Sequence, residues 1–267
     1  MSLFHALVLG LVQGLSEFLP ISSSAHLALL PWIFGWDEPG LAFDVALHVG
    51  TLVAVLAYFR DEWGRLIVAA WEVLRTRRLT TVEQRRVLYL LIATIPGGVG
   101  GLLLEKQAES TFRSPVLIAL MLIVMGAVLW LVDRYASQRR SLDAIGARDA
   151  ILIGVAQVAA LIPGVSRSGA TITAGRALSI DRPGAATFSF LMSMPIIAAA
   201  SVLKVPGLIR MHGVTGATIV GVLAAAASGW FAIATLLPYV SHRSYGIFAI
   251  YRFALGVAVL LLAASRA

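Results

Sequence analysis

The chain has 267 residues, of which 59% are hydrophobic and only 13% are charged, and its mean hydropathy is +0.87. These values exclude an ordinary soluble globular protein, and the absence of cysteine excludes disulfide bonds and thiolate metal sites. The net charge of +7 does not indicate a nucleic-acid partner, because the arginines cluster between apolar segments, as the positive-inside rule expects. We therefore interpret residues 1–267 as a single polytopic membrane domain, all-α in fold class.

The N-terminal segment predicts a helix that does not cross the membrane by itself. Residues 3–18 are too few and too polar on one face to form a simple span. They also lack the basic start of a cleavable signal peptide, and Gln13 and Glu17 interrupt the apolar run. Because Gln13 and Glu17 are four residues apart, they lie on the same face of this helix.

A break and a second short helix follow. Pro20 ends the first helix, and Ser22, Ser23 and Ser24 offer N-caps for a helix that continues through His26. A helix, a break and a helix in so short a stretch indicate a re-entrant hairpin. Such a hairpin is tolerated at membrane depth only when it is buried in protein or lines a cavity.

The remaining apolar segments predict six transmembrane spans, at 41–59, 87–104, 115–132, 185–203, 214–237 and 246–264. The arginine-rich segments 60–86 and 133–149 are expected to be cytoplasmic loops. The segments 105–114, which contains Lys106, and 204–213 are then expected outside. This arrangement places both termini outside the cytoplasm.

A second break lies between the apolar runs 151–160 and 170–178. Pro163 and Gly164 interrupt the helix, and either Ser166 or Ser168 can cap the helix that follows. The first-turn N–H groups of a helix favour anions, and the guanidinium of Arg167 adds a planar fork of donors that suits phosphate. The break therefore predicts a phosphate site inside a membrane protein, with the hydroxyls of Ser168 and Thr171 as further ligands.

The two halves of the chain, about 1–132 and 150–264, repeat each other. The paired positions are Gly10 with Gly154, Gln13 with Gln157, Pro20 with Pro163, Phe43 with Phe188 and Gly126 with Gly256. Three spans separate equivalent points, so the second copy must be inverted relative to the first. We therefore expect the breaks of the two hairpins to meet near the membrane midplane, as in other inverted-repeat membrane proteins.

Two stretches carry a resemblance to a known family. Residues 13–26 (Gln-Gly-Leu-Ser-Glu-Phe-Leu-Pro-Ile-Ser-Ser-Ser-Ala-His) and 163–171 (Pro-Gly-Val-Ser-Arg-Ser-Gly-Ala-Thr) resemble the undecaprenyl-diphosphate phosphatase family of bacteria, of the bacitracin-resistance type. The resemblance runs over essentially the whole chain. It implies an enzyme of the bacterial cytoplasmic membrane that removes the terminal phosphate of a C55 isoprenyl diphosphate. This reaction recycles the lipid carrier of cell-wall synthesis, and the family suggests a pocket open to the outer face.

The resemblance also implies which residues act. The positions that match the family's functional residues are Glu17, Ser23, His26, Ser166, Arg167 and Thr171. Gln13 departs from the pattern, because many members have a second glutamate there, and Ser24-Ala25 stands where Thr-Gly is usual. The first departure puts a two-carboxylate metal scheme in doubt. Mg²⁺ or Ca²⁺ is implied as a cofactor, but with Glu17 as the one carboxylate the ion would be shared with the substrate diphosphate.

These observations combine into a candidate site with two groups of residues. We expect Gln13, Ser22, Ser166, Arg167, Ser168 and Thr171 to bind the substrate, and Glu17, Ser23, His26 and Arg167 to be catalytic. Ser23 is the preferred nucleophile, with Glu17 or His26 as its base. His26 as nucleophile, or a water activated by a metal at Glu17, stays open as an alternative.

Simpler interpretations apply to several of these residues. Arg167 could pair with Glu17 merely to join the hairpins, and the serines could be plain helix caps. Asp44 and His48 fit the membrane interface as well as a catalytic site. Arg252, inside the last span, is expected to snorkel or pair and is left out of the site.

A different function is also compatible with the pattern. Inverted repeats with broken helices are typical of transporters, so a flippase of a lipid phosphate or a transporter of a small anion is the alternative. Turnover separates the two, because a transporter leaves the diphosphate intact. The sequence leaves the oligomeric state open, a homodimer included.

Overall fold

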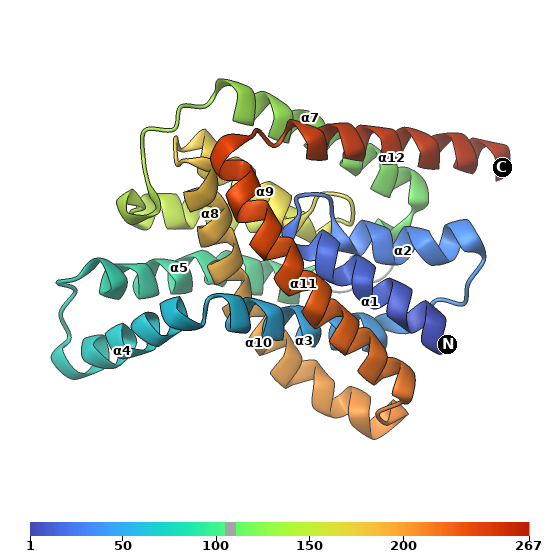
Figure 1. Ribbon diagram of the computed structural model, residues 1–267, viewed down its shortest axis with the longest axis horizontal. Coiled ribbons are helices and arrows are strands. Elements are labelled where there is room, and N and C mark those ends of the chain that lie inside the picture. The colour runs from blue at the N-terminus through green and yellow to red at the C-terminus, as the bar shows by residue number, and fades with distance from the viewer. Residues whose placement is uncertain (105–110, 267) are drawn as a thin grey trace.

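The computed structural model describes residues 1–104 and 111–266, and this part of the chain is helical (Figure 1). The first half contains α1 (Leu3–Phe18), α2 (Ser23–Phe34), α3 (Gly40–Tyr58), α4 (Arg60–Thr76), α5 (Val82–Leu103), the 3-10 turn η1 (Thr111–Arg113) and α7 (Pro115–Tyr135). The second half contains η2 (Leu142–Ala144), α8 (Ala147–Val158), η3 (Ala159–Leu161), α9 (Arg167–Ala177), α10 (Arg182–His212), α11 (Gly216–His242) and α12 (Gly246–Arg266). The predicted all-α fold class is confirmed.

Within residues 1–104 and 111–266, five helices are long and apolar enough to cross a membrane: α5, α7, α10, α11 and α12. The predicted span 41–59 corresponds to α3. This helix qualifies only together with α4, to which it is joined at a bend of 84°. The described part of the chain therefore has the helices of a multi-pass membrane protein, with five spans, or six if the bent pair counts as one.

The prediction that 60–86 is a loop is wrong except for 77–81, because residues 82–86 begin α5 and residues 60–76 form the helix α4. Asp61 and Glu62 lie in its first turn, where carboxylates interact favourably with the helix dipole. Its outer face carries the exposed apolar side chains of Trp71 and Leu74 beside the arginines. The many arginines of this segment indicate a loop, whereas its apolar residues recur at helical spacing. The segment with Lys106 lies outside the described residues.

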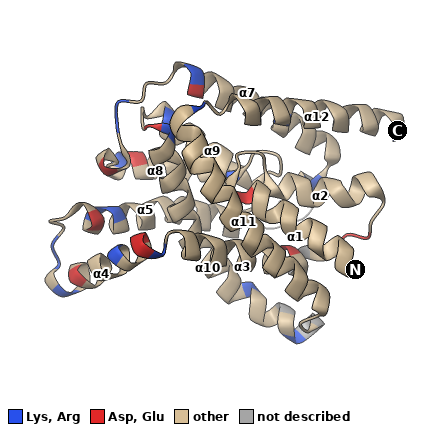
Figure 2. Ribbon diagram, viewed as in Figure 1, with Lys and Arg blue, Asp and Glu red and all other residues tan. Residues whose placement is uncertain are grey.

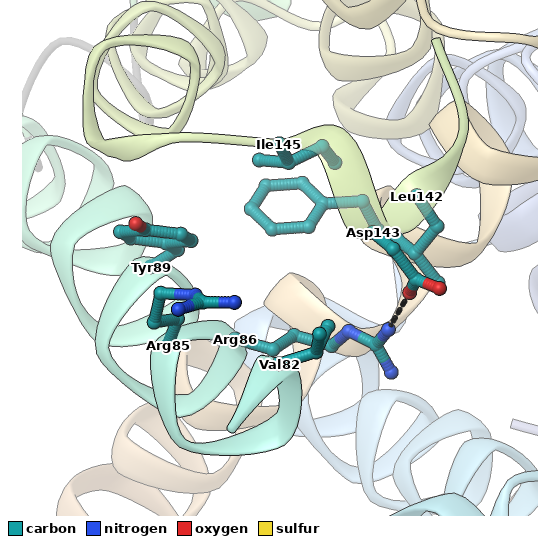
Figure 3. A pocket seen from close by; sticks show the side chains of 8 residues that line it. Val82, Arg85, Arg86, Tyr89, Leu142, Asp143 and Ile145 are labelled. Carbon is teal, nitrogen blue, oxygen red and sulfur yellow. Dashed lines mark hydrogen bonds and ion pairs between the residues drawn. The ribbon is translucent and has the colours of Figure 1, made fainter. Parts of the chain in front are cut away.

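Charged residues gather at one end of the molecule, around α4, the start of α5 and the connection from α7 to α8 (Figure 2). Arg86 joins these elements, since its guanidinium pairs with both Glu62 and Asp143. Figure 3 shows a small pocket beside this ion pair, between the start of α5 and residues 142–145. Both termini lie at the opposite end of the molecule (Figure 1).

The helices pack in two similar sets. In one, α1 lies against α11, which also contacts α3; in the other, α8 lies against α5, which also contacts α10. The pair α3 with α10 joins the two sets, and α7 packs against α12. Small residues allow the close approach: a Cβ at Gly10 would overlap the Gly221 carbonyl, and a Cβ at Gly154 would overlap the Ala93 backbone.

A buried ion pair holds the charged end of this packing together. Asp133 accepts hydrogen bonds from Arg176 Nε at 3.0 Å, Arg182 Nε at 2.8 Å and the Tyr245 backbone N–H at 2.9 Å. The side chain of Arg176 is completely buried and also donates to carbonyls at the end of α7. One carboxylate thereby links α7, α9, α10 and the start of α12.

The close contact of α1 and α11 yields a stability prediction. A Cβ at Gly14 would overlap the Ser228 hydroxyl and the Ala225 carbonyl, whereas no described neighbour lies within 4 Å of a Cβ at Gly98. Gly14→Ala should therefore cost about 1–3 kcal/mol of stability through overpacking, and Gly98→Ala should be neutral or stabilising. Thermal unfolding of both variants in detergent measures the difference, and equal midpoints would contradict the packing.

Candidate active site

The helices α2 and α9 begin in the same unusual way. Ser22 and Ser166 are their N-caps, with φ angles of 76° and 74°, a region that non-glycine residues seldom adopt. Each hydroxyl accepts a hydrogen bond from the backbone N–H three residues later, Ala25 at 3.4 Å and Gly169 at 3.0 Å. Of the two capping serines that the sequence left open in the second break, Ser166 is the one used.

The two breaks, which the repeat predicts to meet, are in direct contact. The Gly164 backbone N–H donates to Ser22 Oγ at 3.1 Å, and Ser168 Oγ donates to the Leu19 carbonyl at 3.1 Å. Each break thus satisfies a backbone group of the other. The first turns of α2 and α9 are thereby held next to one another.

Arg252 of α12 donates hydrogen bonds to backbone carbonyls of both breaks. Its completely buried guanidinium donates to the Pro20 carbonyl of the first break at 3.1 Å. It also donates to the carbonyls of Gly164 at 2.6 Å and Val165 at 3.0 Å in the second break. From the sequence, Arg252 is expected only to snorkel or pair, yet its guanidinium binds the carbonyls that the breaks leave without helical partners.

Glu17 lies at the centre of the polar groups. Its carboxylate accepts hydrogen bonds from Gln13 Nε2 at 3.1 Å, from Ser23 Oγ and from a guanidinium nitrogen of Arg167. His48 Nε2 lies 3.7 Å from Glu17 Oε2. The hairpins are therefore joined by an ion pair, as the simpler interpretation of Arg167 expects, and the serine hydroxyl shares the same carboxylate.

A cavity of about 380 Å³ adjoins this carboxylate. Its polar lining comes from Glu17, Ser23, Ser24, His48, Gln157, Ser166, Arg167, Ser201 and Lys204. Its apolar lining includes Val45, Leu161, Ile196, Ile197 and Ala200. A cationic, hydroxyl-bearing end and apolar walls suit a ligand that has an anionic head and a hydrocarbon tail.

The chain matches the family model described as "Bacitracin resistance protein BacA" over residues 6–258. It is 60% identical over 266 residues to a protein named "Undecaprenyl-diphosphatase" from Gemmatimonas aurantiaca, with 100% of each chain covered. It is 51% identical to proteins of the same name from Pelotomaculum thermopropionicum (100% and 98% of the two chains) and Moorella thermoacetica (97% of each). The chain belongs to the BacA family.

In this BacA-family chain, four predicted site residues lie on the cavity: Glu17, Ser23, Ser166 and Arg167. The other predicted site residues do not line the cavity. Ser22 is a cap and a contact between the breaks, Ser168 holds the Leu19 carbonyl, and Thr171 Oγ1 lies 2.7 Å from Ser189 Oγ. Gln13 is buried and orients Glu17.

His26 also lies behind the cavity. Its Nδ1 is 2.7 Å from the Ser22 carbonyl and its Nε2 is 2.6 Å from the Tyr251 hydroxyl, with the two rings stacked. Both ring nitrogens therefore have partners within the protein. This geometry favours Glu17 over His26 as the group next to the Ser23 hydroxyl.

Five polar residues of the cavity were not assigned to the site from the sequence: Ser24, His48, Gln157, Ser201 and Lys204. His48 directs Nδ1 to the Asp44 carbonyl at 2.7 Å, which leaves Nε2 on the side of Glu17. In the sequence, Gln157 is the repeat partner of Gln13, and this position in the repeat is the signal that indicates a role for it.

The metal ion that the family implies has few protein ligands here. Among the described residues, no group of three or more His, Cys, Asp or Glu side chains could hold a metal ion. Glu17 is the carboxylate of the cavity, and the buried Oε1 of Gln13 beside it has no described hydrogen-bond partner. The residues present do not form a cage on their own.

The position of Arg252 yields a prediction for this BacA-family protein. Arg252→Lys keeps a positive charge, but an ammonium cannot reach the Pro20 and Gly164 carbonyls together. The variant should lose about 2–4 kcal/mol of stability, since buried carbonyls lose charge-assisted hydrogen bonds. Thermal unfolding in detergent tests this, with Arg243→Lys as control because Arg243 is exposed; equal behaviour of the two variants would refute it.

Proposed function

We propose that this protein is an undecaprenyl-diphosphate phosphatase, which hydrolyses undecaprenyl diphosphate to undecaprenyl phosphate and inorganic phosphate. Membership of the BacA family and the names of full-length relatives support this function. The observation that carries it is the hydrogen bond from Ser23 to Glu17 beside Arg167, in a cavity with apolar walls. The product is the lipid carrier of cell-wall synthesis, and its regeneration gives resistance to bacitracin.

In the proposed mechanism, Ser23 Oγ attacks the terminal phosphorus while Glu17 accepts the hydroxyl proton. The bond from phosphorus to the bridging oxygen breaks, so undecaprenyl phosphate leaves with the electron pair and takes the proton from Glu17, and Ser23 carries the phosphoryl group. Glu17, again a carboxylate, then deprotonates a water molecule that attacks phosphorus, and the proton passes from Glu17 to Ser23 Oγ as the serine is released. Phosphoryl transfer requires mainly positioning and charge stabilisation, and these come from Arg167 and from the N-terminus of α9 at Ser166.

Mg²⁺ or Ca²⁺ remains part of the proposal as an ion shared with the substrate. Glu17 would supply the protein carboxylate, and the diphosphate and water the rest of the coordination shell. Such an ion would neutralise phosphate charge in addition to Arg167.

We also propose that the spans and hairpins form an inverted repeat, approximately 1–132 and 150–264, with both termini outside. The matching contacts of α1 with α11 and of α8 with α5 support the repeat, as do the capping serines with similar φ angles. The charged end would face the cytoplasm, away from the termini (Figures 1 and 2). The cavity would then open to the outer face in the bacterial cytoplasmic membrane.

Phosphate release from a C55 or shorter prenyl diphosphate by the purified protein in detergent tests the activity. We expect stoichiometric release of inorganic phosphate and formation of the prenyl monophosphate, with a chelator lowering the rate if the shared ion is required. An intact diphosphate that moves between the leaflets of a vesicle would instead establish the transporter alternative.

Substitution of the nucleophile and of its cationic neighbour separates their roles. Ser23→Ala should nearly abolish phosphate release and leave substrate binding largely intact. Arg167→Lys should cost about 1–3 kcal/mol of transition-state stabilisation, because the lysine keeps the charge but loses the planar fork. Hydrolysis by folded Ser23→Ala protein at close to the parent rate would exclude the serine mechanism.

The absence of native cysteine makes the orientation directly measurable. Thr76→Cys should be labelled by an impermeant maleimide only from the cytoplasmic side, and Ser114→Cys only from outside. The cysteine-free parent controls for background labelling. If both positions react from the same side, the proposed topology fails.

A further inference from the structure

One side chain on the cavity has hydrogen-bonding groups that nothing in the described protein satisfies. Gln157 of α8 lines the cavity with Ser166 and Arg167 and is only 4% exposed. Neither its Nε2 nor its Oε1 has a hydrogen-bond partner among the described residues. An unsatisfied buried amide costs about 1–3 kcal/mol, so its presence at a ligand cavity points to a partner that arrives with the ligand.

The repeat shows what kind of partner is missing. Gln13, at the equivalent position of the first half, donates from Nε2 to the carboxylate of Glu17 one helical turn later. One turn after Gln157 the chain has Leu161, so the second half lacks the corresponding oxyanion. An anionic oxygen of the ligand can take the place that the Glu17 carboxylate occupies in the first half.

Neighbouring residues hold the side-chain amide of Gln157 at the wall of the cavity. Gly97 of α5 lies against it, and a Cβ at Gly97 would overlap Gln157 Nε2. Ile196 of α10 is also close to Gly97, and both residues line the cavity with Gln157, so the amide has apolar neighbours on this side. A donor with apolar neighbours binds an anion more strongly than one in water does.

We propose that Gln157 is a substrate-binding residue, whose Nε2 donates a hydrogen bond to a phosphate oxygen of the diphosphate. The inference rests on the proposed function for the identity of the anion. Gln157 takes no proton and forms no bond to phosphorus, so its contribution is to binding and orientation. Together with Arg167 it surrounds the diphosphate with donors from both α8 and α9.

This role predicts opposite effects on folding and on binding. Gln157→Leu has a similar volume and removes an unsatisfied amide, so the free protein should unfold at the same or a higher temperature. The same variant should bind substrate about 10- to 100-fold more weakly, because a hydrogen bond to a charged group is lost. Gln157→Glu should bind more weakly still, since it places a negative charge beside an anion.

The experiment measures the Kd of a short-chain prenyl diphosphate by calorimetry in the Ser23→Ala background, and KM and kcat in the parent background. Gly97→Ala should weaken binding when Gln157 is present and add little in a Gln157→Ala background, because it acts by displacing the amide. Gly98→Ala is the matched control, with no described neighbour within 4 Å of its Cβ.

Each outcome is decisive. An unchanged Kd and KM for folded Gln157→Leu, or a parallel loss of stability and activity, would show that the amide only packs α5 against α8. If the parent binds the prenyl diphosphate without hydrolysing it, the phosphatase function fails, and the Kd values of the Gln157 variants still test the binding role. A loss of affinity with unchanged or raised stability supports the inference.

Discussion

The site depends on satisfying the backbone at two helix breaks inside an apolar interior. A helix that stops there leaves carbonyl and N–H groups without partners, and hydrocarbon offers none. Arg252 donates hydrogen bonds to carbonyls of both breaks. The hydroxyls of Ser22 and Ser168 each form a hydrogen bond with a backbone group of the other break. The positions of Ser23 and Arg167 follow from this arrangement, because α2 and α9 begin where the breaks end.

The breaks bring opposite charges together at their point of contact. Glu17 comes from the helix that precedes the first break, whereas Arg167 begins the helix that follows the second. Neither charge would be stable in this interior alone, since the cost of desolvating an unpaired ion exceeds several kcal/mol. The ion pair therefore joins the two hairpins and also places both charged groups at the cavity.

The sequence predicted what depends on local rules. Helix ends at Pro20 and Pro163, the serine caps and the shared face of Gln13 and Glu17 follow from backbone chemistry and helical period, and all are found. Membership of the family also followed from short motifs. The helix α4 was missed because its arginines indicated a loop while its apolar spacing indicated a helix.

Contacts between residues far apart in the sequence could not be predicted from these local rules. Arg252 is separated from Pro20 by most of the chain, and no local pattern shows that a lone arginine in an apolar span donates to carbonyls of two breaks. The distinction between cavity residues and supporting residues has the same origin. His26 and Ser23 are three residues apart, yet α2 turns one towards the cavity and the other towards Tyr251 of α12.

The ion pair between Glu17 and Arg167 has a consequence for the end of each catalytic cycle. A carboxylate that already reaches the guanidinium competes with any phosphate bound there. Inorganic phosphate lacks the hydrocarbon tail that adds apolar contacts to the substrate, so it is displaced more easily than the lipid. In the proposed reaction, an internal competitor of this kind limits inhibition by the phosphate product and speeds its release.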